Sequence, residues 1–598
     1  MMHFVCLDFE SYFNTKEGYS LKRMTTESYI RDPRFRAHGA AIYAPTLLDP
    51  GFHWREREQL PGLFASLPWS DIMLLCHHSH FDALILNHHY GVRPRLHLDT
   101  LSMARLLLGN HVRVGLGSLA EQFELQSKNV PYKSFDGRQW EECALDVRNA
   151  IAGGARHDVE LTVQIFQKLK PYFPAGEYPL VDMTVRMFTE PCLVGDVATL
   201  QATEAAEIAR KRDLLAAIGL DNPNVLRADE TFATLLRDLD VEPETKQGKN
   251  GPIYAFALTD RFMDDLLGSD DEQVIALAEA RLAVQSSIQE TRARRLAEMA
   301  GRGPLCLYLA YCGAATTRWS GGDRLNPQNL TPELQASIQA PNGYQLLVAD
   351  ASQIECRLLN YRAGQADVVE RFRTGGDPYT TVASAFYGRA ISKEKDPEER
   401  QVGKLIELSS GYGAGGDTIA RILRVNAGIR LDYQERVRAR DAYRRTHARV
   451  VGLWGQAETA LRWLAEGKPK EWGPVAVRDG CLWLPNGCPL IYDTLKWEPD
   501  GWRVKRRNGW ARLYGAKLVE NLIQALARAY ISDVMNRIIA QGLRIVLSRH
   551  DDVVLLVKPD DAEDVSRWVA EEMKKPPAWA KDIPLGCDCR IGGKLKGD

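Results

Sequence analysis

One ten-residue stretch constrains this chain more than any other. Residues 348–357 read VADASQIECR, so that an apolar strand leads into Asp350 and a turn then opens a helix. An aspartate that caps the N-terminus of a helix is common, and such a cap would explain Asp350. It would not explain the Ser-Gln-Ile-Glu sequence that follows. The stretch therefore predicts a strand, a turn and a helix whose residues do more than cap the helix.

The composition is that of an ordinary globular protein. The 598 residues suggest roughly four folding units. Hydrophobic residues make up 45% and charged residues 26% of the chain, which excludes a disordered or fibrous protein. The formal net charge of -2 excludes a globally basic, histone-like protein but leaves room for a local basic groove.

The sequence also favours a cytoplasmic protein. No apolar run approaches the roughly 20 residues that a membrane helix needs. The first ten residues, MMHFVCLDFE, lack the basic flank and long apolar stretch of a signal peptide. The cysteines form no CxxC motif, and Cys587 and Cys589 alternate like side chains on one strand face rather than like zinc ligands. We therefore expect no membrane association and a reducing compartment, the cytoplasm.

The chain divides into segments of different pattern. Residues 1–170 alternate short apolar runs with helical stretches, an α/β pattern, and residues 170–179 contain the prolines typical of a linker. Residues 195–300 and 361–475 read as helical, with 276–300 as one long helix. Strands are expected at 4–7, 71–76, 344–349, 482–492, 545–547 and 553–557, and further helices at 101–108, 159–169 and 516–539.

Two carboxylates follow the first apolar strand. Asp8 and Glu10 are two residues apart and so point to the same face of a strand. They would repel each other unless a cation lay between them, and oxygen-rich sites of this kind suit Mg²⁺ or Mn²⁺. Asp82 follows the strand at 71–76, and Asp158 lies at the predicted start of a helix. Each acid alone is more typical of a solvated residue or a helix cap.

Taken together and in order, Asp8, Glu10, Asp82 and Asp158 resemble the four acids of the DEDD 3′–5′ exonucleases. Residues 116–125 also resemble the helix between the second and third motifs of that family. The resemblance implies a ribonuclease H-like fold in which the four acids are catalytic. They would hold two divalent ions that activate water and stabilise the leaving oxygen.

The chain departs from these exonucleases at the residue that orients the water. The family has a tyrosine four residues before the last aspartate or a histidine five before it, where this chain has Gly154 and Gly153. His157 is adjacent to Asp158, but neighbouring residues on a helix point in different directions. Two alternatives stay open: an active exonuclease, and a metal-binding domain whose exonuclease is weakened or silent.

The stretch at 348–357 resembles motif A of the family A DNA polymerases. The resemblance implies that Asp350 ligates both catalytic metal ions and that the backbone carbonyl of Ala351 is a further ligand. The family usually has an aromatic residue where Ala351 stands, but only the backbone would be used there. Glu355 would block a 2′-hydroxyl and so favour deoxynucleotides.

Four residues spaced by four lie between this motif and the next acidic turn. Arg400, Lys404, Leu408 and Tyr412 would form one stripe on a helix. Alone, such a stripe is more typical of a solvated face, although Arg and Lys also suit a triphosphate. In this position the stripe resembles motif B of the same family. Arg400 and Lys404 would then bind the phosphates, Tyr412 would stack near the template-primer, and Leu408 replaces the family's aromatic residue.

The sequence His550-Asp551-Asp552 lies between two apolar runs, as in a hairpin turn. Aspartates are common in such turns. In third place along the chain, however, the sequence resembles motif C. Asp551 would be the second metal-binding carboxylate and His550 would touch the primer end. Asp552 stands where the family usually has a glutamate.

Two further segments resemble the parts of family A that lie along DNA. Arg318, Gln328 and Asn329 are the expected contacts of the first, and Gln524 of the second. Donors in the minor groove touch acceptors shared by all base pairs and therefore sense geometry rather than sequence. Basic clusters are consistent with phosphate contacts but equally with a solvated face; they are Arg292, Arg294 and Arg295, and Arg503, Lys505, Arg506, Arg507, Arg512 and Lys517.

The two resemblances together predict a multidomain α/β and α+β chain of a short, bacteriophage-type plan that lacks a 5′-nuclease domain. A ribonuclease H-like 3′–5′ exonuclease domain would be followed by a right-hand polymerase with palm, fingers and thumb. The expected boundaries are 1–180 for the exonuclease, 181–304 for the thumb, 305–360 and 476–598 for the palm, and 361–475 for the fingers.

The expected reaction is template-directed addition of a dNTP to a primer 3′-hydroxyl in DNA replication, with 3′–5′ proofreading. Two Mg²⁺ ions in each site are expected, with Mn²⁺ as a substitute. The expected partners are primer-template DNA, dNTPs and replication accessory proteins, on a monomeric enzyme. The alternative is a polymerase with a weakened or silent exonuclease, specialised for lesion bypass or unusual nucleotides.

Three rival functions are less consistent with the residues. Glu355 and the N-terminal acids argue against a single-subunit RNA polymerase. The set Asp350, Arg400, Lys404, Tyr412 and Asp551 argues against a nuclease whose second half only holds DNA. A catalytically dead nucleic-acid scaffold would lack metal-binding acids, and the chain keeps them.

Overall fold

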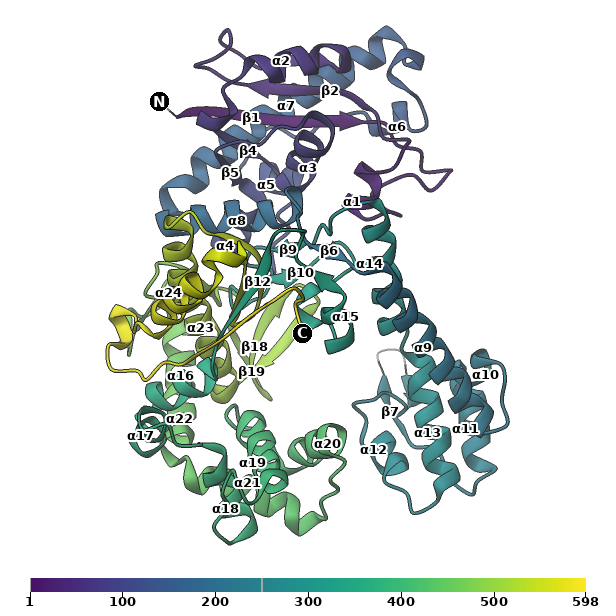
Figure 1. Cartoon of the computed structure of the whole chain (residues 1–598), viewed down its shortest axis with the longest axis vertical. Helices are drawn as coiled ribbons and strands as arrows, with labels where there is room; N and C mark the ends of the chain where they lie inside the picture. Colours follow the sequence, from purple (N-terminus) through teal and green to yellow (C-terminus); the bar gives the residue numbers. More distant parts are fainter. Residues whose placement is uncertain (1, 249–250, 598) are drawn as a thin grey trace.

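The computed structural model of the protein describes residues 2–248 and 251–597 (Figure 1). Residues 1 and 598, the outer bounds of the first and last predicted domains, and residues 249–250 of the predicted thumb lie outside them. An N-terminal α/β part lies at the top of Figure 1, a helical arm at the right and a second helical group at the bottom. Among the described residues, no helix is long and apolar enough to cross a membrane.

The apolar strands of the first segment form a mixed five-stranded sheet. Its order is β3 (His53–Glu56), β2 (Ala37–Tyr43), β1 (His3–Ser11), β4 (Ile72–Cys76) and β5 (Leu96–Asp99). β1 runs antiparallel to β2 and parallel to β4. Helix α7 (Leu145–Leu169) packs against β1 and β2, so the α/β pattern expected for residues 1–170 is confirmed. The other helices here are α1 (Thr26–Ile30), α2 (Leu60–Ser66), α3 (Ser79–Tyr90), α4 (Thr100–Leu108), α5 (Leu116–Gln122) and α6 (Tyr132–Phe135).

Helix α7 begins earlier than the sequence indicated. We expected Asp158 at the start of a helix, but α7 starts at Leu145 and runs through Gly153 and Gly154, so Asp158 lies in its middle. Each glycine inside a helix costs roughly 0.5–1 kcal/mol relative to alanine, so two adjacent glycines disfavour a helix at this point. Burial of one face of α7, which includes Ile151, stabilises the helix across the pair.

The next segment is a helical arm with one β-hairpin. Its stem pairs α9 (Val197–Ala217) with α14 (Ile288–Arg302), and its tip has a hydrophobic core of its own (Figure 1). The single helix expected at 276–300 is instead α13 (Glu272–Gln285) and α14, because the backbone is extended at Ser286. The Ser286 carbonyl accepts a hydrogen bond from Lys211 Nζ at 2.5 Å, and serine competes with helical hydrogen bonding. The tip also contains α10 (Pro223–Arg227), α11 (Asp229–Arg237), β7 (Thr245–Gly248), β8 (Gly251–Tyr254) and α12 (Arg261–Leu267).

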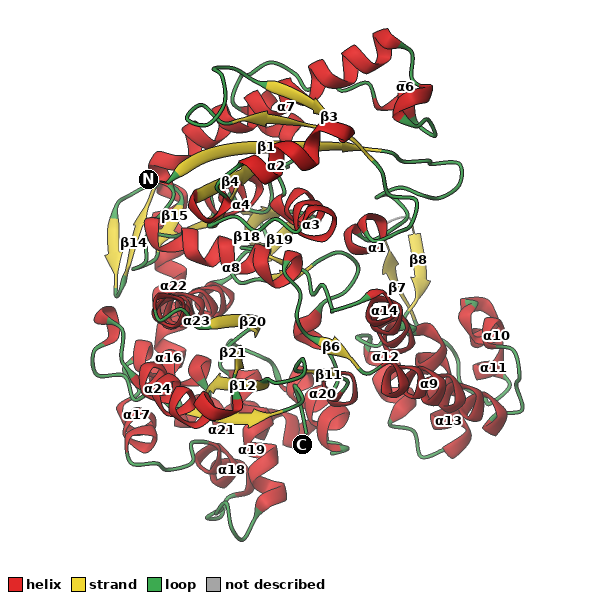
Figure 2. Ribbon diagram, turned by 45° about the horizontal axis from the view of Figure 1, so that its top comes forward, coloured by secondary structure: helices red, strands yellow, loops and turns green. Residues whose placement is uncertain are grey.

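A second sheet joins residues from before and after the second helical group. Its order is β20 (Arg544–Arg549), β21 (Asp552–Val557), β12 (Gln345–Ala351) and β22 (Cys587–Gly592), all antiparallel. Figure 2 shows β20 beside the long helix α23 (Gly515–Ala540), with β21 and β12 below it. The strand expected at 344–349 extends through Asp350 and Ala351, and the sulfur atoms of Cys587 and Cys589 lie 3.4 Å apart on one face. Helices α16 (Ile354–Ala363) and α24 (Ala562–Lys574) pack against this part.

The second helical group follows α16, and its residues between Val382 and Tyr443 form a separate hydrophobic core. It contains α17 (Ala366–Arg373), α18 (Tyr379–Tyr387), α19 (Pro397–Ser410), α20 (Gly416–Ala427), α21 (Tyr433–Thr446) and α22 (Ala448–Glu466). The helical reading of 361–475 therefore holds as far as Glu466. Two small antiparallel sheets come next: β13 (Lys470–Trp472) to β16 (Pro489–Ile491), through β14 (Val475–Arg478) and β15 (Cys481–Trp483), and β17 (Lys496–Glu498), β18 (Gly501–Arg506) and β19 (Gly509–Leu513).

The segment at 170–179 is not a loose linker. It forms two short 3-10 turns, η4 (Lys170–Tyr172) and η5 (Ala175–Glu177), and continues into α8 (Tyr178–Thr189). Glu177 is buried and accepts hydrogen bonds from both terminal nitrogens of Arg528 on α23, at 2.6 Å each. Tyr311 donates its hydroxyl to the same carboxylate at 2.5 Å.

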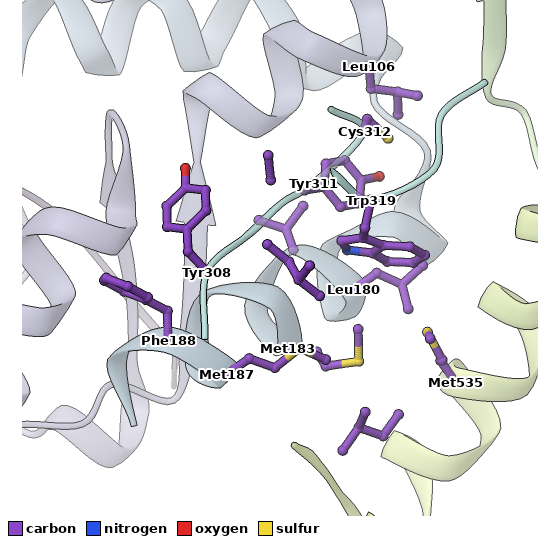
Figure 3. Packing of buried hydrophobic residues seen from close by; sticks show 14 of the residues in the cluster. Leu106, Leu180, Met183, Met187, Phe188, Tyr308, Tyr311, Cys312, Trp319 and Met535 are labelled. Carbon is purple, nitrogen blue, oxygen red and sulfur yellow. The ribbon is translucent and has the colours of Figure 1, made fainter. Parts of the chain in front are cut away.

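Apolar side chains around α8 join the first part of the chain to the rest. Figure 3 shows Leu180 and Met183 of α8 between Tyr308 and Trp319 on one side and Met535 of α23 on the other. These residues belong to a hydrophobic core that also includes residues of the first sheet and of the second. The chain is therefore held together by one continuous core, with separate smaller cores at the arm tip and in the second helical group.

Candidate active sites

The end of the second sheet brings two predicted carboxylates together. Asp350 lies near the end of β12, where it pairs in register with Asp552 of β21 and with Asp588 of β22. Asp551 lies in the tight turn before β21, and its backbone carbonyl accepts a hydrogen bond from the Ala351 amide at 3.0 Å. The strand pairing thus places Asp350 and Asp551 at one edge of the sheet, although 200 residues of sequence separate them.

The environment of this edge favours protonated acids or a bound cation. Burial, with the neighbouring Asp552 and Asp588, raises the pKa of Asp350 to about 6. Burial also raises the pKa of Asp551 to about 7, against the opposing effect of Arg318. Clustered carboxylates repel one another in their charged forms, and a divalent cation bound among their oxygens would relieve that repulsion.

The two remaining acids at this edge differ in their partners. Asp552 is buried and accepts three hydrogen bonds from Arg549, from its backbone amide and two guanidinium nitrogens. Asp588 is exposed and accepts a hydrogen bond from the Ser352 hydroxyl at 2.6 Å. Asp588 is absent from the residues predicted above, although it alternates with Cys587 and Cys589 on a strand and pairs in register with Asp350.

Glu355 is held between an arginine and a tyrosine. Arg318 Nη2 donates to Glu355 Oε1 at 2.6 Å and to Asp551 Oδ1 at 3.1 Å. The Tyr412 hydroxyl donates to Glu355 Oε2 at 2.9 Å. Arg318, expected among the DNA contacts, is thus part of the acidic site itself. A cavity of about 330 Å³ lies here, lined by Glu355, Leu408, Tyr412 and Asp551 among others.

The residues spaced by four lie on α19 with one exception. Arg400, Lys404 and Leu408 are on the helix, but α19 ends at Ser410 and Tyr412 lies in the following turn. Arg400 forms an ion pair with Asp377, and its guanidinium lies over the ring of Tyr379. Leu408 is 50% exposed, so it faces the open side of the cavity rather than a core.

The predicted DNA contacts lie in two places. His550 Nε2 is 3.4 Å from Asn329 Oδ1, which places the acidic turn beside the segment with Gln328. Gln328 is buried, and its side-chain oxygen has no hydrogen-bond partner among the described residues. Gln524 lies on α23, where its amide nitrogen is 3.4 Å from Glu520 Oε1.

The arginines of the predicted thumb helix have partners within the protein. Arg292 donates to the Asn329 carbonyl at 2.7 Å, Arg295 to the Arg324 carbonyl, and Arg294 pairs with Glu204 at 2.7 Å. These contacts attach α14 to the segment around Asn329. They indicate a structural role for this basic cluster.

The second acidic site lies on the first sheet. Asp8 and Glu10 of β1 and Asp158 of α7 place carboxylate oxygens within 4.8 Å of one another. Asp82 is not part of this 4.8 Å group, but it lines the same cavity as Asp8 and Glu10, and its Oδ1 accepts a hydrogen bond from the Phe9 amide at 3.0 Å. The structure therefore brings three of the four acids into one tight cluster and places Asp82 beside it.

The three clustered acids have the character of a cation site. Burial raises the pKa of Asp8 to about 7, partly offset by the charge of Lys128, and burial also raises the pKa of Glu10. Asp158 is buried, and its Oδ1 has no hydrogen-bond partner among the described residues. Three carboxylates with an unpartnered oxygen match the hard oxygen ligands that Mg²⁺ and Mn²⁺ take, so the residues present fit a divalent ion.

Two residues that sequence reasoning missed also lie at this site. Lys128 Nζ forms an ion pair with Asp158 Oδ2 and lies 5.3 Å from the centre of the Tyr132 ring. Tyr132 lines a cavity of about 480 Å³ together with Asp8, Glu10 and other residues. Both come from a stretch without apolar periodicity, so no sequence signal pointed to them. His157 is directed elsewhere, with Nε2 at 3.2 Å from the Ser127 carbonyl.

Comparison with known sequences bears on the polymerase-like part. Residues 272–455, which carry Asp350, Glu355 and the stripe on α19, match the sequence profile described as DNA polymerase family A. The similarity to DNA polymerase family A thus covers residues 272–455 of the chain. A DNA polymerase of Bacillus phage SP02 is 31% identical over 295 residues, which is 46% of this chain and 44% of the relative. DNA polymerase I of Pseudomonas aeruginosa is 24% identical over 528 residues, 83% of this chain and 53% of the relative.

Similarity of fold to a solved structure extends over nearly the whole chain. The POL domain of Pol1 from M. smegmatis, solved in complex with DNA primer-template and dNTP, superposes with a TM-score of 0.69 at 18% identity. The superposition covers 99% of this chain and 95% of that one. At this identity the match shows the fold alone. The chain spans 44% and 53% of the lengths of the phage and Pseudomonas relatives.

Proposed function

We propose that the protein is a DNA-directed DNA polymerase that adds dNTPs to a primer 3′-hydroxyl and releases pyrophosphate. The observation that carries the proposal is the pairing of β12 with β21, which sets Asp350 beside the turn that holds Asp551. The match of residues 272–455 to the family A profile supports it, as do the names of the relatives, which are DNA polymerases.

In this proposal Asp350, Asp551 and the Ala351 carbonyl hold the divalent ions of the polymerase site, two Mg²⁺ or Mn²⁺. Bound there, the ions would lower the pKa of the primer hydroxyl and stabilise charge on the transferred phosphoryl group. Arg400 and Lys404 bind the triphosphate from α19. Glu355, fixed by Arg318 and Tyr412, faces the sugar and excludes a 2′-hydroxyl.

The remaining assignments follow the same scheme. Primer-template DNA contacts Gln328, Asn329, Gln524 and His550, and Leu408 and Tyr412 pack against the incoming nucleotide. Residues 181–304 serve as the thumb, 305–360 and 476–598 as the palm, and 361–475 as the fingers. The enzyme acts as a monomer, with replication accessory proteins as further partners.

We also propose that residues 1–180 are a ribonuclease H-like 3′–5′ exonuclease domain. Asp8, Glu10 and Asp158 would hold a divalent ion, and Asp82 would complete the site from its position beside Phe9. The alternative remains a weakened or silent exonuclease on a polymerase specialised for lesion bypass or unusual nucleotides. Gly154, at the position of the family's tyrosine, is the residue that favours this alternative.

The decisive experiment uses one labelled primer-template with a matched or a mismatched 3′ end in Mg²⁺. We expect extension with dNTPs by the wild type and by Asp560→Ala, an exposed control, and none by Asp350→Ala. Shortening of the mismatched primer without dNTPs, lost in Asp8→Ala, would support proofreading. DNA binding without any extension would replace the polymerase with a nucleic-acid scaffold, and equal use of rNTPs would overturn the role given to Glu355.

A further inference from the structure

A nine-residue strap, residues 127–135, crosses the acidic site of the first sheet. It lies between α5 and the start of α7 and ends in the short helix α6. One end is fixed to α7, because His157 Nε2 is 3.2 Å from the Ser127 carbonyl. At the other end Phe135 is fully buried and its ring packs edge-on against Phe13 at 5.4 Å.

The middle of the strap rests on Gly154. A Cβ atom added at Gly154 would lie 2.9 Å from both Cα and Cγ2 of Val130, so no larger residue fits without moving the strap. A Cβ atom at the adjacent Gly153 would meet no described atom within 4 Å. Gly154, which stands where the DEDD exonucleases have a tyrosine, therefore leaves room for the strap.

The strap carries two polar side chains into the acidic site. Lys128 Nζ pairs with Asp158, which is fully buried, and its charge lowers the pKa of Asp8 and Asp158 against the effect of burial. Tyr132 is 41% exposed, lines the same cavity as Asp8 and Glu10, and lies within cation–π distance of Lys128.

An ammonium group at this place has a definite electrostatic consequence. Three buried carboxylates within 4.8 Å of one another repel strongly when ionised. Lys128 offsets that repulsion while no divalent ion is bound, and it competes with such an ion for Asp158. A phenol O–H beside the cluster is a neutral donor that can bind a water molecule or a phosphate oxygen.

We propose that the strap is a functional part of the acidic site, in which Lys128 is the counter-ion of the carboxylates while no metal ion is bound. Tyr132 supplies the hydroxyl that positions the water molecule or the phosphate oxygen. On metal binding Lys128 leaves Asp158 and turns to the phosphate, which it can bind as a point charge. Tyr132 holds the water or the phosphate oxygen opposite the carboxylates. The role of Tyr132 rests on the proposed exonuclease function, whereas the role of Lys128 as counter-ion does not.

The counter-ion role is tested by metal binding rather than by activity. The full chain would carry Asp350→Asn and Asp551→Asn, so that bound Mn²⁺, counted by electron paramagnetic resonance, reports the first-sheet site. We expect Lys128→Met to bind Mn²⁺ about tenfold more tightly, because the competing cation is gone. Lys128→Arg keeps the charge and should remain within about twofold of the parent. An unchanged affinity in Lys128→Met would overturn the counter-ion role.

The positioning role is tested by comparing shortening with extension. Tyr132→Phe should slow shortening of a mismatched primer by about tenfold or more, with extension and Mn²⁺ affinity unchanged. Gly154→Ala should displace the strap and abolish shortening of the mismatched primer. Its affinity for Mn²⁺ should rise to that of Lys128→Met. Gly153→Ala, the same change one residue away on the same helix, should behave as the wild type.

The outcomes separate this proposal from the exonuclease itself. If the wild type shortens the primer and Asp8→Ala does not, normal shortening by Tyr132→Phe and Gly154→Ala refutes the strap alone. If the wild type does not shorten the primer, the exonuclease proposal and the role of Tyr132 fail together. The Mn²⁺ measurement on Lys128→Met still decides the counter-ion role in that case.

Discussion

The Tyr412 hydroxyl donates a hydrogen bond to Glu355 at 2.9 Å and thereby fixes the carboxylate at the cavity beside Asp551. Arg318 holds the other carboxylate oxygen at 2.6 Å. A glutamate whose two carboxylate oxygens are both hydrogen-bonded is held in one side-chain conformation and can block the space beside it. The proposed selection against ribonucleotides therefore depends on three residues, not on Glu355 alone.

The first prediction concerns this selection. We expect Glu355→Ala to raise rNTP incorporation relative to dNTP incorporation by about tenfold or more, since the carboxylate that excludes the 2′-hydroxyl is removed. Tyr412→Phe should raise it less, because Arg318 still holds Glu355. Competition between rNTP and dNTP on one primer measures the ratio. Glu394→Ala, an exposed change on the same chain, serves as the control, and an unaltered ratio in Glu355→Ala would exclude the assigned role.

The second prediction separates two adjacent aspartates. Asp551→Ala should abolish extension but leave the free energy of unfolding unchanged or higher, because one repelling carboxylate is lost. Asp552→Ala should lower the free energy of unfolding by about 3 kcal/mol, since it leaves Arg549 partly buried without its partner. Urea unfolding and primer extension on both variants check this. Equal stability of the two variants would contradict the structural role of Asp552.

The third prediction concerns pH. The folded-state pKa values of Asp8 and Asp551 are about 7 and that of Asp350 about 6, all above the unfolded values near 4. Between these limits each of these three carboxyl groups binds more protons in the folded chain than in the unfolded chain. Their contribution to the free energy of unfolding should therefore fall as pH rises from about 5 to about 8 when EDTA removes divalent ions, and the difference between the wild type and Asp8→Asn isolates the part due to Asp8.

Added Mn²⁺ should flatten this pH dependence, because the ion replaces the protons among the carboxylates. Asp8→Asn should flatten it in part without metal. Urea unfolding at several pH values measures both effects. A free energy of unfolding that rises over the same range in EDTA, in the wild type and not in Asp8→Asn, would contradict the raised pKa of Asp8.

The fourth prediction concerns the Arg400 ion pair. Asp377 binds Arg400 and also accepts a hydrogen bond from the Tyr379 amide at 3.0 Å. Asp377→Asn keeps an oxygen for that amide but removes the charge that competes with a triphosphate. We expect the KM for dNTP to fall about threefold in Asp377→Asn and to rise in Arg400→Ala. Steady-state extension measures both, and a raised KM in Asp377→Asn would show that the ion pair positions Arg400 instead.

Much of both acidic sites was predictable from the sequence because their carboxylates lie on, or next to, regular strands. Asp350 ends an apolar strand and Asp551 lies between two others, and the resemblance to family A gave their order along the chain. The same holds for Asp8 and Glu10, which share a strand face. Pairing of these strands then follows from burying their apolar faces.

The remaining features of the two sites depend on contacts that leave no periodic pattern in the sequence. Lys128 reaches Asp158 from an irregular segment, and Asp588 becomes a neighbour of Asp350 only through the position of β22. The continuation of α7 through Gly153 and Gly154 depends on burial of one face of that helix, which includes Ile151. Such long-range packing is set by the whole tertiary structure and not by local propensity.

The buried pair of Glu177 and Arg528 has a practical consequence for the preparation of shortened versions of the protein. A shortened version that starts after α7 and the 3-10 turns would delete the only acid that neutralises Arg528 among the contacts described for it, and would strip the apolar cover from α8. The proposed exonuclease activity is therefore better removed by a point substitution such as Asp8→Ala than by truncation. The same reasoning makes the first 180 residues a poor candidate for separate expression.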